Sequence, residues 1–458
     1  MRIVRRKLLG GFRIVGLSAF AFLAILNFGC STSARSVSAE PEREQRNRIA
    51  MESAKASIDK FRKGEINITV VDETGRPVPN AEITIQQISH TFKFGCYLKI
   101  DDLDPAKLPN YQRRFSALFN YAVIGTYWDA NENKRGEENW LWFDREAELA
   151  RQMGMRIQAA PVLWGTNKYG APAWLPREAS ELRAVLDRRV RSVVARNANI
   201  ADWEIVNEPL APKKDAFASV GTDEYIASAF RTAKETAPAG RRLINEFGIF
   251  GSSDKQNYNR DRYFDLLQRL IANGVPIDVI GIQAHANGEW FEPADVADQL
   301  KRYGSLGKPV QITEFSVQTA DINGRRSPKT ISGPYRSGIW DDDKQAEFYR
   351  EFYTVAFGDP NVEAIVTWGL DDERAWLPGI GLIDNNGEPK AAYTELDRLI
   401  NNEWKTNSAA RTDGNGVHIT RGFLGEYEIT AASGSKRAKA KFALTSGGKS
   451  DWLVKLRN

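Results

Sequence analysis

The chain has 458 residues, of which 42% are hydrophobic and 27% are charged, a composition that excludes a largely disordered protein. Its net charge of +4 arises in residues 1–29, which carry five basic side chains and no acid, so that the rest holds 58 basic and 59 acidic residues, a net of −1. A near-neutral chain gives no global electrostatic case for binding nucleic acid, and we expect no such partner.

Residues 1–29 have the layout of a secretory signal peptide. Early basic residues precede an apolar run at 14–28, which is too short for a good membrane span. Arg5 and Arg6 resemble a weak twin-arginine signal, and Cys30 resembles a lipoprotein cleavage site, although the residues before it match that pattern poorly. We expect export to the periplasm, the outer membrane or the medium, with Cys30 lipidated; a single N-terminal membrane anchor is the alternative.

Two short segments follow the signal. Residues 30–62 are predicted to be a tether that leads into a short amphipathic helix from Ile49 to Phe61, because apolar residues recur there at steps of three and four. Residues 63–91 instead alternate apolar and polar side chains on both sides of a turn cluster at 72–77. That change of period predicts a small N-terminal β unit.

Short apolar runs alternate with longer helical patterns between residues 92 and 404. The predicted strands are 121–126, 156–163, 201–206, 242–246, 278–284, 309–313 and 363–368. The predicted helices include 142–154, 179–196, 223–236, 260–273, 292–303 and 342–357. Repeated β–α units indicate a parallel sheet, and about eight of them predict an α/β fold closed into a (β/α)₈ TIM barrel. The doubly wound alternative lacks a glycine-rich phosphate fingerprint after any early strand.

Residues 405–458 return to β character, with glycine-rich turns between strand-like runs, and predict a small C-terminal β module. This module either binds polysaccharide or only packs on the barrel. Its single tryptophan, Trp452, makes a thin platform for a polymer and favours packing.

The cysteines and histidines give little sign of a structural framework or a metal. Two cysteines do not make a disulfide scaffold, and if Cys30 is lipidated we expect Cys96 to be a buried thiol. Three histidines are too few and too scattered for a zinc site. No metal and no cofactor is predicted.

Acids, amides and tryptophans follow several of the predicted barrel strands at the point where each strand ends. They are Asn207 and Glu208, Asn245 and Glu246, Gln283 and His285, Glu314, and Trp368. Catalytic groups of such barrels lie at the carboxyl ends of the strands, so these side chains are expected on one rim.

Two carboxyl groups on that rim suit the hydrolysis of a glycosidic bond. One must be a protonated acid that serves the leaving oxygen, and the other an ionised nucleophile or base. Asn207 is placed to bond a sugar 2-hydroxyl, and ten of the twelve tryptophans lie between Trp128 and Trp376 and offer faces for sugars. The alternative is that Glu208 and Glu314 are solvated acids at strand ends.

Several motifs resemble, in chain order, those of glycoside hydrolase family 10, the family of endo-β-1,4-xylanases. They are Trp203–Pro209, Asn245–Phe247, Gly281–His285, Ile312–Phe315 and Trp368–Asp372, the last followed by Trp376. The likeness covers 92–404, and the two flanking β segments resemble those of plant-type members.

This resemblance implies a retaining glycoside hydrolase that cleaves xylan or a related hemicellulose backbone. Glu208 would be the general acid/base and Glu314 the nucleophile, oriented by His285. Asn207 and Gln283 would support the pair. The substrate-binding residues would be Trp164, Asn245, Trp368 and Trp376.

Three alternatives to this function remain. They are a β-glycanase acting on another, decorated or non-xylan polysaccharide, a carbohydrate-binding protein with a degenerate barrel, and a barrel enzyme of another hydrolase family. A monomer whose partner is a polysaccharide is expected, with the membrane reached only through the lipid anchor.

The sequence departs from the family pattern on three strands. Ala160 and Gly165 stand where the family usually has histidines, and residues 125–129 lack its Glu-Asn pair and lysine. Ser316 stands where an aspartate usually follows the nucleophile. Each lost hydrogen bond to a sugar is worth about 1 kcal/mol, so the upstream pocket is expected to suit a different or decorated sugar, or the xylanase activity to be weak.

Overall fold

The computed structural model describes residues 34–166, 170–210, 215–254, 256–320, 329–331, 333–447 and 450–457. The predicted signal at 1–29 and its Cys30 lie outside the described residues. The chain divides into two units, residues 1–45 and residues 46–458, and the second holds every strand. No helix within the described ranges combines the length and the apolar character needed to cross a membrane.

Helix α1 (Ala34–Phe61) begins fifteen residues before the predicted start at Ile49, so the expected tether is largely helical. Residues 40–48 consist mainly of Glu, Arg and Gln, which favour helix without any apolar period to reveal it. Within the second unit, Ala54 and Ile58 are buried in the large hydrophobic core. The last turns of α1 are therefore part of the folded body.

Eight parallel strands of the described chain close into a barrel, which confirms the predicted fold. They are β3 (Lys93–Tyr97), β4 (Tyr121–Gly125), β5 (Arg156–Ala160), β7 (Asp202–Asn207), β8 (Arg241–Glu246), β9 (Val279–Ala286), β10 (Val310–Val317) and β13 (Val362–Thr367). The ring closes because β13 pairs with β3 and β5 pairs with β7. A short strand, β6 (Leu163–Trp164), adds to β7.

The first barrel strand, β3, is missing from the predicted strands. It begins three residues after β2 (Glu82–His90) ends, so no turn signal or change of period separates the two. The other seven predicted strands match the observed ones within a few residues, because each is a buried apolar run with a helix on either side.

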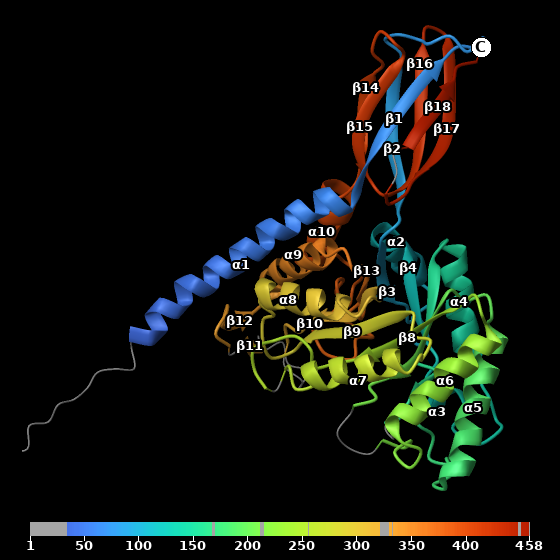
Figure 1. The fold of residues 1–458 in the computed structure, drawn as a ribbon, viewed down its shortest axis with the longest axis vertical. Coiled ribbons are helices and arrows are strands. Elements are labelled where there is room, and N and C mark those ends of the chain that lie inside the picture. The colour runs from blue at the N-terminus through green and yellow to red at the C-terminus, as the bar shows by residue number, and fades with distance from the viewer. Residues whose placement is uncertain are drawn as a thin grey trace, which may run out of the picture. The chain divides into compact units, whose positions relative to one another are not determined.

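Helices lie around the barrel, as Figure 1 shows for α7, α8 and α9 beside β8, β9 and β10. In chain order they are α2 (Leu108–Leu118), α3 (Trp128–Asn131), α4 (Leu141–Gln152), α5 (Ala179–Arg196), α6 (Thr222–Thr236), α7 (Arg260–Ala272), α8 (Pro293–Gly304), α9 (Asp342–Gly358), α10 (Ala391–Asp397) and the π-helical turn η1 (Arg398–Glu403). A two-stranded hairpin, β11 (Lys329–Ile331) with β12 (Gly338–Trp340), precedes α9. Each long helix buries one apolar face; Phe352 of α9, for example, stacks on Phe315 of β10 at 4.3 Å.

The terminal β segments form one module, whereas the sequence predicts two. Its strands are β1 (Lys63–Val71), β2, β14 (Asn407–Arg411), β15 (Val417–Phe423), β16 (Gly425–Ser433), β17 (Lys436–Leu444) and β18 (Ser450–Lys455). They form the sheets β15-β1-β18 and β14-β2-β16-β17, so each N-terminal strand lies between C-terminal ones (Figure 1). Pairing across more than 300 residues leaves no local signal in the sequence.

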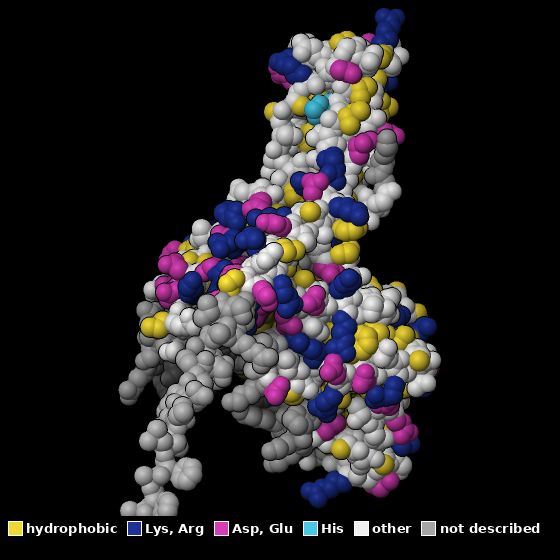
Figure 2. All heavy atoms as spheres, turned by 60° about the vertical axis from the view of Figure 1, so that its left-hand side comes forward, with side chains coloured by type: hydrophobic (Ala, Val, Ile, Leu, Met, Phe, Trp, Pro, Cys, Tyr) yellow, Lys and Arg dark blue, Asp and Glu magenta, His cyan; other side chains and the backbone are white. Residues whose placement is uncertain are grey.

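The module has a core of its own, which includes Ile66, Ile83 and Tyr427. Trp452 is buried in it and stacks on Phe442 with ring centroids 5.0 Å apart. The lone tryptophan of the C-terminal segment is therefore a packing residue. Figure 2 shows Lys/Arg and Asp/Glu side chains interspersed over the visible face, in keeping with the near-neutral charge.

Candidate active site

A cavity of about 970 Å³ lies where the carboxyl ends of the barrel strands meet. Most of the predicted site residues line it: Trp164, Asn207, Glu208, Gln283, His285, Glu314, Trp368 and Trp376. Asn245 is fully buried behind this lining and reaches the site through hydrogen bonds. The structure therefore brings together residues that are up to 212 positions apart in the sequence.

Glu208 directly follows β7 and has an unusual backbone conformation. Its φ of 51° lies in the left-handed region, and its amide N–H donates to Asn245 O at 2.8 Å. The Trp164 indole Nε1–H donates to Oε2 at 3.0 Å and the Gln283 amide to Oε1 at 2.9 Å. One donor on each oxygen fixes the orientation of the carboxyl group.

Burial raises the pKa of Glu208 to about 7. The hydrogen bond from Gln283 opposes this shift, and the negative charge of Glu314 adds to it. A carboxyl group with such a pKa holds its proton near neutral pH, which is the property that a general acid needs.

Glu314 lies within β10 and is bound by two side-chain nitrogens. Asn245 donates its amide N–H to Oε1 at 2.8 Å, and His285 Nε2 lies 3.1 Å from Oε2. The side chain is only 9% exposed, so these two contacts take the place of water around the carboxyl group.

His285 is in turn held by Ser316, whose Oγ lies 2.8 Å from its Nδ1. When Glu314 is ionised, Nε2 must carry a proton to donate to it, and Nδ1 of a neutral ring then accepts from the serine hydroxyl. Ser316, which stands where the family usually has an aspartate, thus begins a hydrogen-bond chain that runs through His285 to Glu314.

The side-chain amides of Asn245 and Asn207, behind the two carboxyl groups, are oriented by one hydrogen-bond network. The Thr313 hydroxyl donates to Asn245 Oδ1 at 2.6 Å, which leaves the Asn245 amide nitrogen to donate to Asn207 Oδ1 at 3.0 Å and to Glu314. Asn207 also hydrogen-bonds Glu208 and lowers its pKa. The predicted bond from Asn207 to a sugar would therefore add to an existing bond with the acid.

The tryptophans of the rim differ in exposure. Trp376 is 53% exposed and sets its ring edge-on against His285 at 4.8 Å. Trp368 is half-buried and stacks on Tyr97, with ring centroids 4.4 Å apart. Both offer an aromatic face beside the carboxyl pair, where a sugar ring would bind.

The sequence reasoning missed Glu204 and named Glu246 only as a strand-end acid; the structure buries both carboxyl groups in this region. Burial, with the charges of Glu314 and Glu208, raises the pKa of Glu204 well above its usual value. Burial also raises the pKa of Glu246 to about 8, and its Oε2 accepts the Leu210 N–H at 2.9 Å just past Glu208. The feature of the sequence that marks them is a glutamate inside an apolar strand (Glu204) or at its end (Glu246).

The structure gives physical reasons for two of the sequence departures. A Cβ atom at Gly165 would lie 2.0 Å from Asp215 Oδ1, so a side chain there would require Asp215 to move. Ala160 is 1% exposed and lies in a small core beneath Tyr97 and Trp368. Neither position is open to a ligand.

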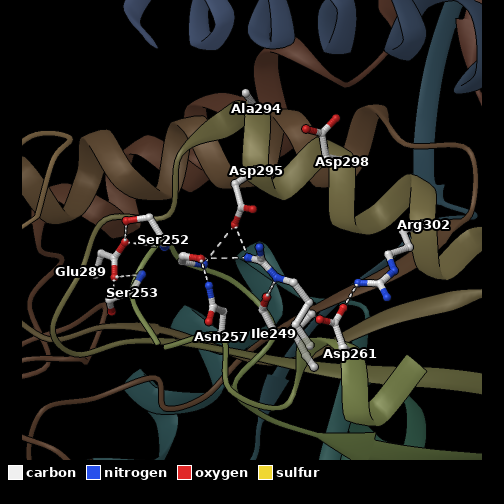
Figure 3. Close-up of polar contacts among 12 residues, drawn as sticks. Ile249, Ser252, Ser253, Asn257, Asp261, Glu289, Ala294, Asp295, Asp298 and Arg302 are labelled. Atoms are coloured by element: carbon white, nitrogen blue, oxygen red, sulfur yellow. Dashed lines mark hydrogen bonds and ion pairs between the residues drawn. The ribbon is translucent and has the colours of Figure 1, made fainter. Parts of the chain in front are cut away.

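The loop after β8 carries Phe247, Gln256 and Tyr258 into the cavity wall. Figure 3 shows how it is held: Glu289 accepts the backbone and hydroxyl protons of Ser252 and Ser253. On the same loop, Asp295 of α8 accepts from Gly251 N at 3.0 Å and from Arg260 at 2.8 Å. Glu289 and Asp295, which belong to the β9–α8 unit, thus hold the loop after β8 in place.

Among the residues with described positions, no three His, Cys, Asp or Glu side chains form a group that could hold a metal ion.

Comparisons with known proteins agree with this geometry. Residues 85–398 match the family Glycosyl hydrolase family 10. The chain is 27% identical to endo-1,4-beta-xylanase B of Thermotoga neapolitana over 305 residues, 63% of this chain and 82% of that protein. It is 26% identical to the anti-sigma-I factor RsgI6 of Acetivibrio thermocellus over 385 residues, 83% of this chain but only 46% of that protein.

The fold is similar to that of xylanase 10B from Thermotoga petrophila RKU-1, solved in complex with xylobiose, with a TM-score of 0.57 at 23% identity over 68% of this chain and 95% of that one. The structure of a family 10 protein from Paenibacillus barcinonensis matches with a TM-score of 0.56 at 22% identity, over 68% and 95% of the two chains. Since the family match spans well over half of the sequence, this protein belongs to glycosyl hydrolase family 10 and is a glycoside hydrolase.

Proposed function

We propose that this protein is a retaining, endo-acting hydrolase of β-1,4-linked xylan or a related hemicellulose backbone. The observation that supports it best is the contrast between two carboxyl groups in one cavity. Glu208 is buried with a pKa of about 7, whereas Glu314 contacts the Asn245 amide N–H and His285 Nε2. A carboxyl group that can give a proton, beside a second one held in place as a nucleophile, is what this reaction requires.

In the first step Glu314 attacks the anomeric carbon as the bond to the leaving oxygen breaks, and Glu208 gives its proton to that oxygen. This forms a covalent glycosyl–enzyme ester and releases the shortened chain. In the second step the Glu208 carboxylate takes a proton from water, whose oxygen attacks the anomeric carbon and frees Glu314. Two inversions retain the configuration of the sugar.

The polymer backbone is inferred from the relatives, which include endo-1,4-beta-xylanases, and from the aromatic rim. Trp368 and Trp376 suit the flat faces of β-linked sugars. The altered residues at 160, 165 and 316 favour a related or decorated backbone over unsubstituted xylan as the best substrate.

A product profile on xylan, β-glucan, mannan and arabinan tests this function. We expect β-1,4-linked oligosaccharides from xylan or a related backbone, with the β-anomer formed first in NMR spectra. Glu314→Gln and Glu208→Gln should each lower kcat by about 10²–10⁴-fold with the fold intact. Binding of the polymer without hydrolysis by the unaltered protein would indicate a carbohydrate-binding role instead.

We also propose that the protein is exported and acts as a monomer anchored through a lipid on Cys30. The basic and apolar pattern of 1–29 supports export. Mass spectrometry of the mature N-terminus should find a diacylglyceryl cysteine that Cys30→Ser lacks, and an unmodified start elsewhere would contradict the anchor. Light scattering of the detergent-free Cys30→Ser protein should give the monomer mass.

A further inference from the structure

Two tyrosines line the active-site cavity on the side formed by β3 and β4. Tyr97 ends β3 and Tyr127 follows β4, and both are half-buried. Tyr97 stacks on Trp368 with an interplanar angle of 17°, and its hydroxyl hydrogen-bonds that of Tyr127. Three aromatic rings from three different strands thus form one wall, which we call the tyrosine wall: Tyr97, Tyr127 and Trp368.

Small residues beneath and beside the tyrosine wall leave room for its aromatic rings. A Cβ atom at Gly125 would lie 2.8 Å from a Tyr127 ring carbon and 3.0 Å from the Tyr97 hydroxyl oxygen. Ala160 packs below, in the core that Tyr97 and Trp368 cover. A larger polar side chain at Gly125 or Ala160 would displace one of the aromatic rings. The tyrosine wall therefore needs small residues at these two positions.

The tyrosine wall offers a sugar one hydroxyl donor at most. The carboxyl groups of Glu314, Glu204 and Glu208 all act on Tyr127, and with burial they raise its pKa, so the phenol stays protonated. None of these three is among the main influences on Tyr97. In the hydrogen bond between the two hydroxyl groups Tyr97 donates and Tyr127 accepts, so the proton of Tyr127 is not used in that bond.

Such a wall discriminates weakly against substituents on the sugar. A subsite that binds several sugar hydroxyls rejects a substituted sugar, because its buried polar groups are then left unpaired. Aromatic faces leave nothing unpaired when a hydroxyl is acylated, and the acyl group adds apolar surface that they can cover.

We propose that Tyr97, Tyr127 and Trp368 form a sugar subsite that accepts O-acylated sugars, so that an acetylated β-glycan is a substrate without prior deacetylation. This inference rests on the proposed hydrolysis of a β-1,4-linked backbone. Tyr127 supplies the single donor to the bound sugar, and Tyr97 fixes the direction of that donor.

The test compares one acetylated xylan before and after mild alkaline deacetylation. We expect the unaltered enzyme to give kcat/KM values within about threefold of each other on the two forms. Tyr127→Phe should lower kcat/KM about tenfold on both, the value of one hydrogen bond of about 1.4 kcal/mol. Tyr97→Ala, which removes the stacked ring, should raise KM more than it lowers kcat.

Tyr393→Phe is the matched control, because that tyrosine bonds Arg114 O outside the barrel and should leave the kinetics unchanged. A more than tenfold gain on deacetylation, or Tyr127→Phe and Tyr97→Ala variants that behave like the control, would overturn the subsite. If neither xylan is cleaved but another glycan of the panel is, the proposed backbone is wrong, and the two variants assayed on that glycan still decide whether the wall binds sugar.

Discussion

At the scale of single residues, Glu208 and Glu314 have the same chemistry and different neighbours. Trp164 and Gln283 each donate to Glu208, which nevertheless keeps a raised pKa of about 7 because it is buried. Glu314 instead faces Asn245 and a histidine. The different surroundings of the two carboxyl groups thus come from three other strands, β6, β8 and β9.

The first prediction concerns the pH profile. Glu208 must be protonated to act as the acid, so kcat/KM should fall as the pH rises through about 7. Gln283→Leu removes a donor to the ionised form, which raises the pKa of Glu208, and the basic limb should move to higher pH. Profiles measured on an aryl glycoside with a poor leaving group would show this, and an unmoved or lowered limb would argue against Glu208 as the acid.

The second prediction concerns Ser316, which holds the ring nitrogen of His285 that faces away from Glu314. Ser316→Ala removes one hydrogen bond worth about 1 kcal/mol and leaves the ring free to rotate, so kcat should fall about fivefold with KM little changed. Ser316→Thr keeps the hydroxyl and serves as the control. Equal kcat values for the alanine variant and the unaltered enzyme would remove Ser316 from the positioning of the nucleophile.

At the scale of elements, the cavity is built from loops that depend on the following β–α unit. The clearest case is the loop after β8, which Glu289 and Asp295 hold from outside (Figure 3). Its aromatic residues Phe247 and Tyr258 line the cavity, and we expect their placement to depend on those two carboxylates.

The third prediction tests that support. Glu289→Gln replaces an acceptor of four hydrogen bonds by an amide with one accepting oxygen, which should cost about 1–3 kcal/mol in urea unfolding and raise KM. Asp298→Asn is the control on the same segment: its contact with Arg46 is exposed and should cost at most about 0.5 kcal/mol. A cost no larger than that of the control would show that the loop stands without Glu289.

The pH dependence of the same contact has a definite sign. Burial raises the pKa of Glu289, but the hydrogen bonds from Ser252 and Ser253 outweigh it and leave the pKa below the usual value. A depressed pKa means that the contact stabilises the fold above the ordinary glutamate range and is lost as the pH falls below it.

At the scale of the whole molecule, the two ends of the chain depend on each other. β1 pairs with β15 and β18, and β2 pairs with β14 and β16. The N-terminal strands therefore have no sheet of their own until the last 50 or so residues are present, and two strands alone are marginal in water.

The fourth prediction follows from that dependence. A chain ending at Trp404 should expose β1 and β2 as unpaired edges and aggregate, which size-exclusion chromatography would detect. A chain that lacks only residues 1–33 keeps every strand that the structure describes and should stay soluble. A soluble, active protein ending at Trp404 would mean that the barrel does not need the module.

Much of the fold could be predicted because its elements carry local signals. Apolar runs such as 201–206 and amphipathic runs such as 179–196 show their period in the sequence, and an acid that follows such a run, such as Glu208, stands out against it. β3 and the first half of α1 could not be predicted, because one lacks a preceding turn and the other an apolar stripe.

The sequence by itself determined the barrel, seven of its eight strands and the choice of Glu208 and Glu314 as the candidate carboxyl pair, because periodicity and motif are local properties of the chain. Only the tertiary structure decided that the terminal β segments form one module, that Ser316 supports His285, and that two tyrosines occupy one wall of the cavity. Each of these depends on contacts between residues far apart in the chain, and hydrogen bonds, burial and steric fit of that kind arise only when the chain folds.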